Sequence, residues 1–130
     1  MPESKIFDTV AKAFGISAWP VTAVKAFVGH SLAPASADQL TSTLGVMEHE
    51  ILPGIKTISS VAEDVFADRL SIALEDTHIE DRAQIGFLNS KGFGGNNATG
   101  TIISPNIAET MLRKRYGEKV FSGYQKRREK

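Results

Sequence analysis

A turn rich in glycine and asparagine, lying between two strand-like segments, constrains the fold more than any other feature of the sequence. Residues 84–89 and 98–103 combine apolar and β-branched side chains, as strands do. Between them, residues 90–97 read Ser-Lys-Gly-Phe-Gly-Gly-Asn-Asn, and glycine and asparagine tolerate the positive φ angles of tight turns. We therefore expect an antiparallel β-hairpin in this part of the chain.

Two amphipathic helices are expected before the hairpin. Apolar residues recur at helical spacing in residues 4–14, and Gly15 follows as a stop signal. A second helix is expected over residues 35–50. The face that packs on the sheet should carry Leu40, Leu44 and Met47.

Short extended segments are expected on either side of the second helix. The β-branched run of residues 21–28, bounded by Pro20 and Gly29, predicts a largely buried strand. Residues 51–55 indicate a brief extended segment and a turn, and residues 71–74 an edge strand.

Less regular patterns complete the chain. Residues 61–70 leave room for one or two helical turns, and the charged residues 75–82 are typical of an exposed loop. After Pro105, Asn106 is expected to cap a terminal helix. The order α-β-α-β-β-α indicates an α/β fold in two or three open layers.

Composition excludes several classes of protein. The 130 residues fit one domain of ordinary size and include no cysteine. Disulfides, zinc–thiolate sites and a cysteine nucleophile are therefore excluded within this chain. No apolar run approaches the length of a membrane helix, and the first residues do not resemble a signal peptide, so the cytoplasm is the expected compartment.

The charge is unevenly distributed. The chain carries 15 basic and 15 acidic residues, but residues 113–130 hold eight basic and two acidic ones, which leaves +6 there and −6 in the preceding part. We therefore divide the chain into a domain at residues 1–105 and a basic helix or tail at residues 106–130. Such a segment is usually a solvated terminal helix, and it can also bind nucleic acid or an acidic partner.

The first candidate site contains Lys25 and His30. A lysine on the expected buried strand needs a partner, because desolvating its ammonium group is costly. His30 follows that strand at its carboxyl end, where α/β folds place ligands. The alternative is that Lys25 extends to solvent and His30 caps the loop.

The second candidate site is the glycine-rich turn. Closely spaced Gly92, Gly94 and Gly95 let a ligand approach the backbone and provide N–H groups to an oxyanion. Phe93 either packs inward or plugs a pocket. Residues 91–94 also match the opening of an RNA-binding motif, but the residues that follow offer no ring for a base to stack on, so nucleic-acid binding is the weaker hypothesis.

Other ionisable residues give no stronger signal. His49 and His78 lack metal-ligand spacing, so no metal site is expected. Four further carboxylates are expected to be solvated charge, with a catalytic acid–base pair as the less favoured alternative; they are Asp64, Asp68, Glu75 and Asp76.

Taken together, Lys25-x-x-x-Gly29-His30-Ser31-Leu32 and residues 89–98 resemble the β-ketoacyl-acyl carrier protein synthases. The resemblance extends from about Glu3 to Pro105. It implies the C-terminal half of a thiolase-like α/β fold, with a mixed β-sheet flanked by helices and the first strands missing. It also implies a decarboxylative Claisen condensation in fatty-acid synthesis, with acyl carrier protein and acyl or malonyl thioesters as partners and with no cofactor or membrane.

The resemblance implies roles for the residues of both candidate sites. His30 matches a histidine that stabilises the enolate, and Lys25 a lysine that orders it. Phe93, with Gly92 and Gly94, matches the gate of the acyl pocket and part of the oxyanion hole. Asn89 and Gly95 are expected to contact substrate.

The resemblance also implies that the chain is incomplete as a catalyst. The nucleophilic cysteine and the first histidine of the family have no counterpart, so the chain alone is expected to be inactive and to form a homo-oligomer or be completed by the missing N-terminal half. The alternative function is a non-catalytic RNA- or protein-binding module that uses the hairpin and the tail. The synthase hypothesis requires that His30 and Phe93 line one cavity.

Overall fold

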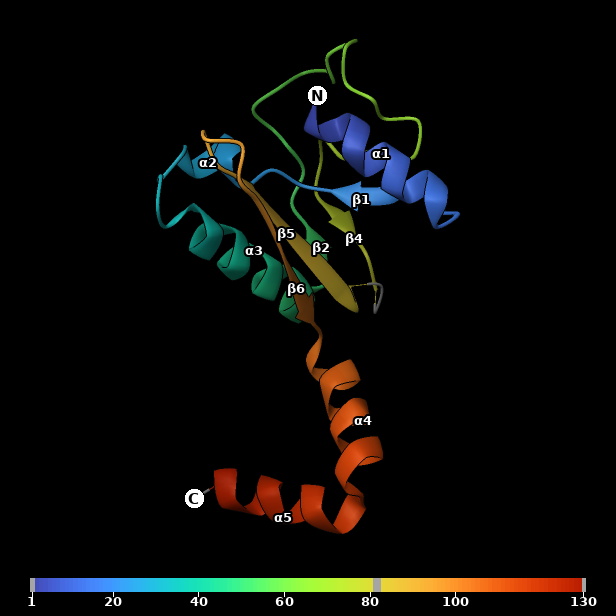
Figure 1. The fold of residues 1–130 in the computed structure, drawn as a ribbon, viewed down its shortest axis with the longest axis vertical. Helices are drawn as coiled ribbons and strands as arrows, with labels where there is room; N and C mark the ends of the chain where they lie inside the picture. Colours follow the sequence, from blue (N-terminus) through green and yellow to red (C-terminus); the bar gives the residue numbers. More distant parts are fainter. Residues whose placement is uncertain (1, 81–82, 130) are drawn as a thin grey trace. The chain divides into compact units, whose positions relative to one another are not determined.

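The computed structural model describes residues 2–80 and 83–129, in two compact units, Met1–Glu80 and Asp81–Lys130 (Figure 1). The first unit contains α1 (Glu3–Ala13), β1 (Trp19–Val21), α2 (Lys25–Val28), α3 (Ala35–His49), β2 (Ile51–Leu52), β3 (Leu70–Ile72) and β4 (Thr77–His78). The second contains β5 (Ile85–Lys91), β6 (Asn97–Ile103), α4 (Pro105–Tyr116) and α5 (Glu118–Arg128). The division into residues 1–105 and 106–130 stays a prediction.

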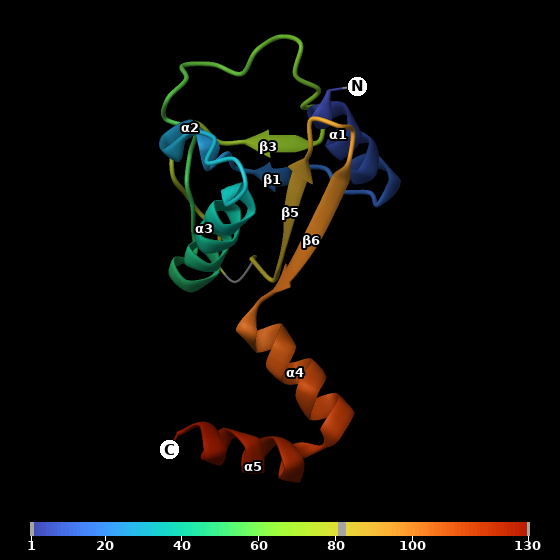
Figure 2. The same ribbon diagram turned by 60° about the vertical axis from the view of Figure 1, so that its left-hand side comes forward.

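Helix α1 packs on the first strand pair. Strands β1 and β3 are parallel and lie side by side (Figure 2). Phe7 of α1 meets Trp19 of β1 edge-to-face, with ring centroids 6.3 Å apart. The Asp8 carboxylate accepts a hydrogen bond of 2.8 Å from the backbone N–H of Arg69, just before β3. With Ala11 fully buried, these contacts join the expected first helix to the nearby β1 and to β3, more than fifty residues along the chain.

The predicted strand at residues 21–28 is wrong over most of its length. Within this range only Val21, the last residue of β1, belongs to a strand. Residues Lys25–Val28 form the single helical turn α2, in which Val28 donates its N–H to the carbonyl of Val24 at 3.3 Å. Strand pairing stops because β3, the partner of β1, ends at Ile72, opposite Val21. Without a partner strand, the backbone of α2 satisfies its hydrogen bonds locally. The helical turns expected at residues 61–70 are likewise absent, since that segment consists of turns and bends before β3.

Helix α3 forms as expected, but its buried face differs from the prediction. Its buried residues are Ala35 and Val46, whereas Leu44 is 49% exposed. The reason is that α3 packs against the short β2 that follows it, rather than against a broad sheet. Strand β2 pairs antiparallel with β4.

The second unit confirms the hairpin and its boundaries to within two residues. Strands β5 and β6 are antiparallel, with Ile85 opposite Ile103 and Lys91 opposite Asn97 (Figure 2). Ser104, rather than the expected Asn106, precedes the first terminal helix, and Pro105 occupies its first turn.

Two helices, and not one, follow the hairpin. Gly117, at φ +80°, separates α4 from α5. Phe121 of α5 is 4% exposed, and the guanidinium of Arg113 on α4 lies 4.3 Å from the centre of its ring. This contact closes the corner between the two helices.

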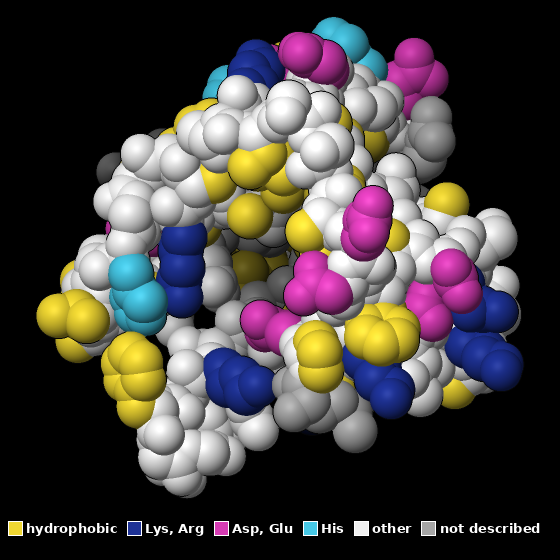
Figure 3. All heavy atoms as spheres, turned by 90° about the horizontal axis from the view of Figure 1, so that it is seen from above, with side chains coloured by type: hydrophobic (Ala, Val, Ile, Leu, Met, Phe, Trp, Pro, Cys, Tyr) yellow, Lys and Arg dark blue, Asp and Glu magenta, His cyan; other side chains and the backbone are white. Residues whose placement is uncertain are grey.

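Apolar side chains are poorly enclosed. Among the described residues eight hydrophobic ones are buried, and many large ones are exposed, including Phe14 at 79% and Leu32 at 69%. Figure 3 shows hydrophobic side chains at the surface among charged ones. The strands form three two-stranded sheets in the described part of the chain. Its helices are all too short or too polar to cross a lipid bilayer.

Candidate functional site

His30 lies in the loop between α2 and α3. Gly29 ends α2 with φ +73°, a conformation that favours glycine. The backbone N–H of Leu32 donates to Nδ1 of His30 at 3.0 Å. Because Nδ1 is the acceptor, the neutral ring carries its proton on Nε2. Nε2 is then a hydrogen-bond donor, as stabilisation of an oxyanion requires.

Lys25 does not occupy the environment that the sequence predicted. It begins α2 and is exposed, so its ammonium group stays in contact with water and needs no buried partner. His30 follows a helical turn, and not the carboxyl end of a strand. The two residues nonetheless share one short segment of the first unit.

The glycine-rich turn belongs to the second unit. The N–H of Gly92 donates to the carbonyl of Asn96 at 2.7 Å, and the N–H of Gly95 donates to the carbonyl of Gly92 at 3.1 Å. These two donors therefore close the turn. Gly95 alone of the three candidate glycines has a positive φ, +83°. Phe93, at the tip, is 97% exposed, so it does not pack inward.

Asn89 lies on β5, away from the tip of the turn. Its Oδ1 accepts a hydrogen bond of 2.9 Å from the hydroxyl of Thr99, its cross-strand neighbour on β6. This contact joins the two strands at that position. His30 and Lys25 thus belong to Met1–Glu80, whereas Asn89 and the glycine-rich turn belong to Asp81–Lys130.

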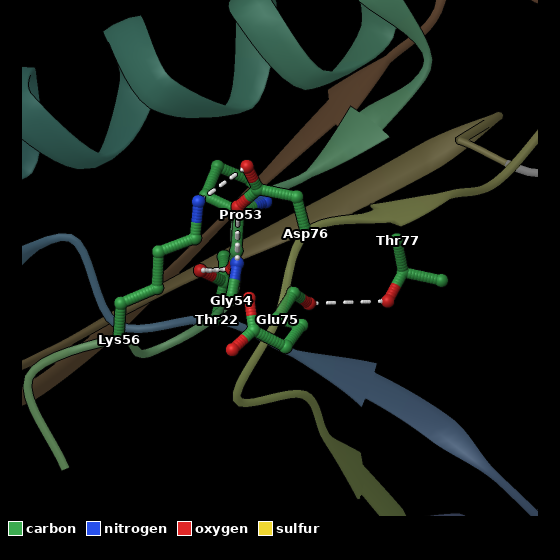
Figure 4. Close-up of polar contacts among 7 residues, drawn as sticks. All are labelled: Thr22, Pro53, Gly54, Lys56, Glu75, Asp76 and Thr77. Atoms are coloured by element: carbon green, nitrogen blue, oxygen red, sulfur yellow. Dashed lines mark hydrogen bonds and ion pairs between the residues drawn. The ribbon is translucent and has the colours of Figure 1, made fainter.

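The sequence did not indicate a polar cluster around Gly54, shown in Figure 4. Asp76 accepts a hydrogen bond from the N–H of Gly54 at 3.1 Å, and its other oxygen lies 2.6 Å from Nζ of Lys56. Thr22 donates its hydroxyl to the carbonyl of Pro53 at 2.9 Å. The signal that could have found the cluster is the Pro-Gly pair, since a Cβ on Gly54 would lie 2.3 Å from the backbone carbon of Glu75.

This cluster gives Asp76 a structural partner. The hydrogen bond from Lys56, and then that from Gly54, lowers the pKa of the Asp76 carboxyl below its ordinary 3.8, and the same contact raises the pKa of Lys56 above 10.5. Asp76 therefore stays ionised as the partner of an ammonium group, not as half of a carboxylate pair. Residues 2–80 and 83–129 contain no group of three or more side chains suited to a metal ion.

Comparisons with known proteins show similarity to a ketosynthase. No protein-family model matches the chain. The chain is 61% identical over 127 residues to the β-ketoacyl-[acyl-carrier-protein] synthase FabY of Pseudomonas aeruginosa. The matched segment covers 98% of this chain and 20% of the relative. The crystal structure of the noncanonical ketosynthase FabY from P. aeruginosa matches 98% of the chain with a TM-score of 0.92 and 61% identity.

The chain is therefore related to the β-ketoacyl-acyl carrier protein synthases, as its motifs indicated, and it spans about a fifth of the length of the curated relative. The structural match confirms the predicted α/β, ketosynthase-like fold. An RNA-binding module is not favoured.

Proposed function

We propose that the chain is the C-terminal part of a 3-oxoacyl-[acyl-carrier-protein] synthase that acts in fatty-acid biosynthesis. One observation carries this proposal: 61% identity and a TM-score of 0.92 to a ketosynthase over 98% of the chain. The reaction would be the decarboxylative condensation of malonyl-carrier protein with an acyl thioester. The carrier protein and its thioesters are the proposed partners.

The proposed chemistry divides between this chain and the rest of the synthase. This chain has no cysteine, so the thiolate that holds the acyl group comes from the remainder of the enzyme. The bond between the malonyl α-carbon and its carboxylate breaks, CO₂ leaves, and the electron pair enters an enolate. The enolate carbon attacks the acyl thioester, and the cysteine thiolate is released.

His30 would act on the enolate oxygen. Its Nδ1 accepts the N–H of Leu32, so Nε2–H is the donor that strengthens as negative charge develops on that oxygen. Lys25, five residues earlier and exposed on α2, would help to order the ring and nearby water. Phe93 would gate the acyl chain beside Gly92 and Gly94, and Asn89 and Gly95 would contact substrate.

Replacement of His30 tests this proposal in the assembled synthase. His30→Ala should lower CO₂ release from malonyl-carrier protein by on the order of 10²–10³, because it removes the enolate donor, while acylation of the cysteine continues. His49→Ala, which alters an exposed histidine at the end of α3, is the matched control. Normal decarboxylation by His30→Ala would refute the role of His30.

We also propose that the whole enzyme is cytoplasmic and homodimeric. A reaction that depends on a thiolate suits a reducing compartment. The exposed apolar side chains of this chain provide surface that further subunits or the rest of the enzyme would cover.

A further inference from the structure

The loop that carries His30 is tied to α3 by contacts that the proposed function does not assign. The hydroxyl of Ser31 donates to a carboxylate oxygen of Asp38, in the first turn of α3, and both side chains are half-buried. The N–H of Ala35 donates to the carbonyl of Leu32 at 3.2 Å, and Ala35 is buried. Hydrogen bonds therefore hold the loop at the side chain of Ser31 and at the carbonyl of Leu32.

These hydrogen bonds hold Leu32 in a strained backbone conformation. Its φ is +62°, a left-handed conformation that is unfavourable for a leucine and persists only where the surroundings impose it. The N–H of Leu32 points at Nδ1 of His30. The backbone of Ser31 sets the direction of this N–H, because the peptide plane that carries it precedes the φ bond of Leu32. If the Ser31 backbone turned, the N–H would leave the ring, and Nδ1 would lose the donor that fixes the tautomer.

We propose that Asp38 is a positioning residue for His30: it binds the Ser31 hydroxyl, holds the peptide between Ser31 and Leu32 in place and so keeps the His30 ring protonated on Nε2. The consequence for catalysis rests on the proposed function, whereas the arrangement of the loop does not.

The same contacts distinguish this arrangement from a Ser-His-Asp triad. In a triad the imidazole is bonded to both the hydroxyl and the carboxylate. Here the Ser31 hydroxyl binds Asp38 directly, and Nδ1 of His30 is occupied by a backbone N–H. Ser31 is thus an anchor for the loop, and Asp38 acts on His30 through the backbone.

Hydrogen exchange at the Leu32 amide, measured on the whole chain at single-residue resolution, tests the proposal. Asp38→Ala should reduce the protection of this amide by about tenfold, the effect expected for losing one hydrogen bond to a charged group. Ser31→Ala should do the same. Asp38→Asn keeps an acceptor oxygen and should restore most of the protection. Glu48→Ala, which removes an exposed carboxylate from the other end of α3, is the matched control and should change nothing.

The ¹⁵N NMR signals of the His30 ring, assigned by their loss in His30→Gln, give a second measurement. They should change from one tautomer toward a mixture in Asp38→Ala and Ser31→Ala. Unchanged Leu32 protection and unchanged ring signals in both variants would overturn the proposal. If Asp38→Ala also exposes the amides of α1, it has unfolded the unit, and Ser31→Ala decides by the same criterion.

The kinetic consequence is measured separately in the assembled synthase. Asp38→Ala should lower kcat for decarboxylation and leave KM nearly unchanged, because the ring is misdirected while substrate binding remains, and Asp38→Asn should recover activity. If His30→Ala proved fully active, the proposed function of His30 would fail, but the exchange result would still decide whether Asp38 orders the loop.

Discussion

At the scale of single residues, the close approach of another backbone segment constrains Gly54. A Cβ at Gly54 would lie 2.3–2.5 Å from three backbone atoms of Glu75, so no side-chain movement can relieve the clash. Gly45, inside α3, has open space around it. Only the structure shows that there is room for a methyl group at Gly45 and none at Gly54.

We predict opposite effects of alanine at these two glycines. Gly54→Ala should lower the free energy of unfolding by about 1–3 kcal/mol, because the backbone must shift to admit the methyl group. Gly45→Ala should raise it by about 0.5–1 kcal/mol, because alanine favours the helix. Urea unfolding followed by circular dichroism measures both. Equal effects of the two substitutions would contradict the close approach at Gly54.

The ion pair of Asp76 and Lys56 predicts a pH dependence of stability. The pKa of Asp76 is lowered from 3.8 and that of Lys56 is raised from 10.5. The pair therefore stabilises the fold fully between these values. Its contribution is lost as pH falls through the folded pKa of Asp76, or rises through that of Lys56.

Asp76→Asn isolates this effect, since the amide oxygen can still accept from Gly54. The stability difference between the original chain and Asp76→Asn should be constant near neutral pH and should vanish as the pH falls well below 3.8. Because the two side chains are about half exposed, the difference should also shrink in high salt. A difference that persisted in acid would show that Asp76 acts other than as a carboxylate.

At the scale of elements, Arg113 makes the main side-chain contacts between helices α4 and α5. Arg113 lies 3.8 Å from Glu109 on its own helix, pairs with Glu118 at the start of α5, and covers the ring of Phe121. The sequence alone indicated a basic helix or tail. It did not show that Arg113 is neutralised within the corner, or that neighbouring cations stay exposed.

Arg113→Ala should loosen α5, because Phe121 loses its cover and Glu118 loses its partner. We expect the amides of α5 to exchange about three- to fivefold faster. Lys114→Ala removes an adjacent cation that makes no ion pair among the described residues, so it should leave exchange in α5 unchanged. Similar effects of the two substitutions would assign the effect to net charge, and not to the corner.

Elements whose pattern is local could be predicted, and those that need a partner could not. Helices α1 and α3 and the β5–β6 hairpin form where periodicity and turn residues indicate them. The segment at residues 21–28 has strand-like side chains throughout, yet its second half is helical, because β3 offers partners only to Trp19–Val21. The prediction of the candidate site contains the same error, because it placed Lys25 on a buried strand.

At the scale of the whole molecule, the exposed apolar surface is the main feature. Few hydrophobic residues are buried, while Phe14, Phe27 and Leu32 are at least half exposed. The chain spans a fifth of a related synthase. Apolar surface of this kind promotes association, so this chain should not remain a monomer by itself.

Sedimentation velocity tests this expectation. The isolated chain should form concentration-dependent oligomers, and adding the remaining part of the synthase should replace them with a defined complex, because the exposed side chains become covered. A matched control is the chain with Phe14→Ser and Leu32→Ser, which should associate less. A compact monomer at every concentration would contradict the expectation.

The sequence by itself determined the elements that short windows encode: two amphipathic helices, a hairpin closed by glycine, and the two motifs that mark a relative of the ketosynthases. Those features depend on side-chain spacing and turn geometry within about twenty residues. The tertiary structure decided which side of α3 is buried, where β1 ends, and that Asp76 binds Gly54 from 22 positions away. These outcomes depend on which distant segment supplies a hydrogen-bond partner or an apolar neighbour, and only the folded chain brings those segments together.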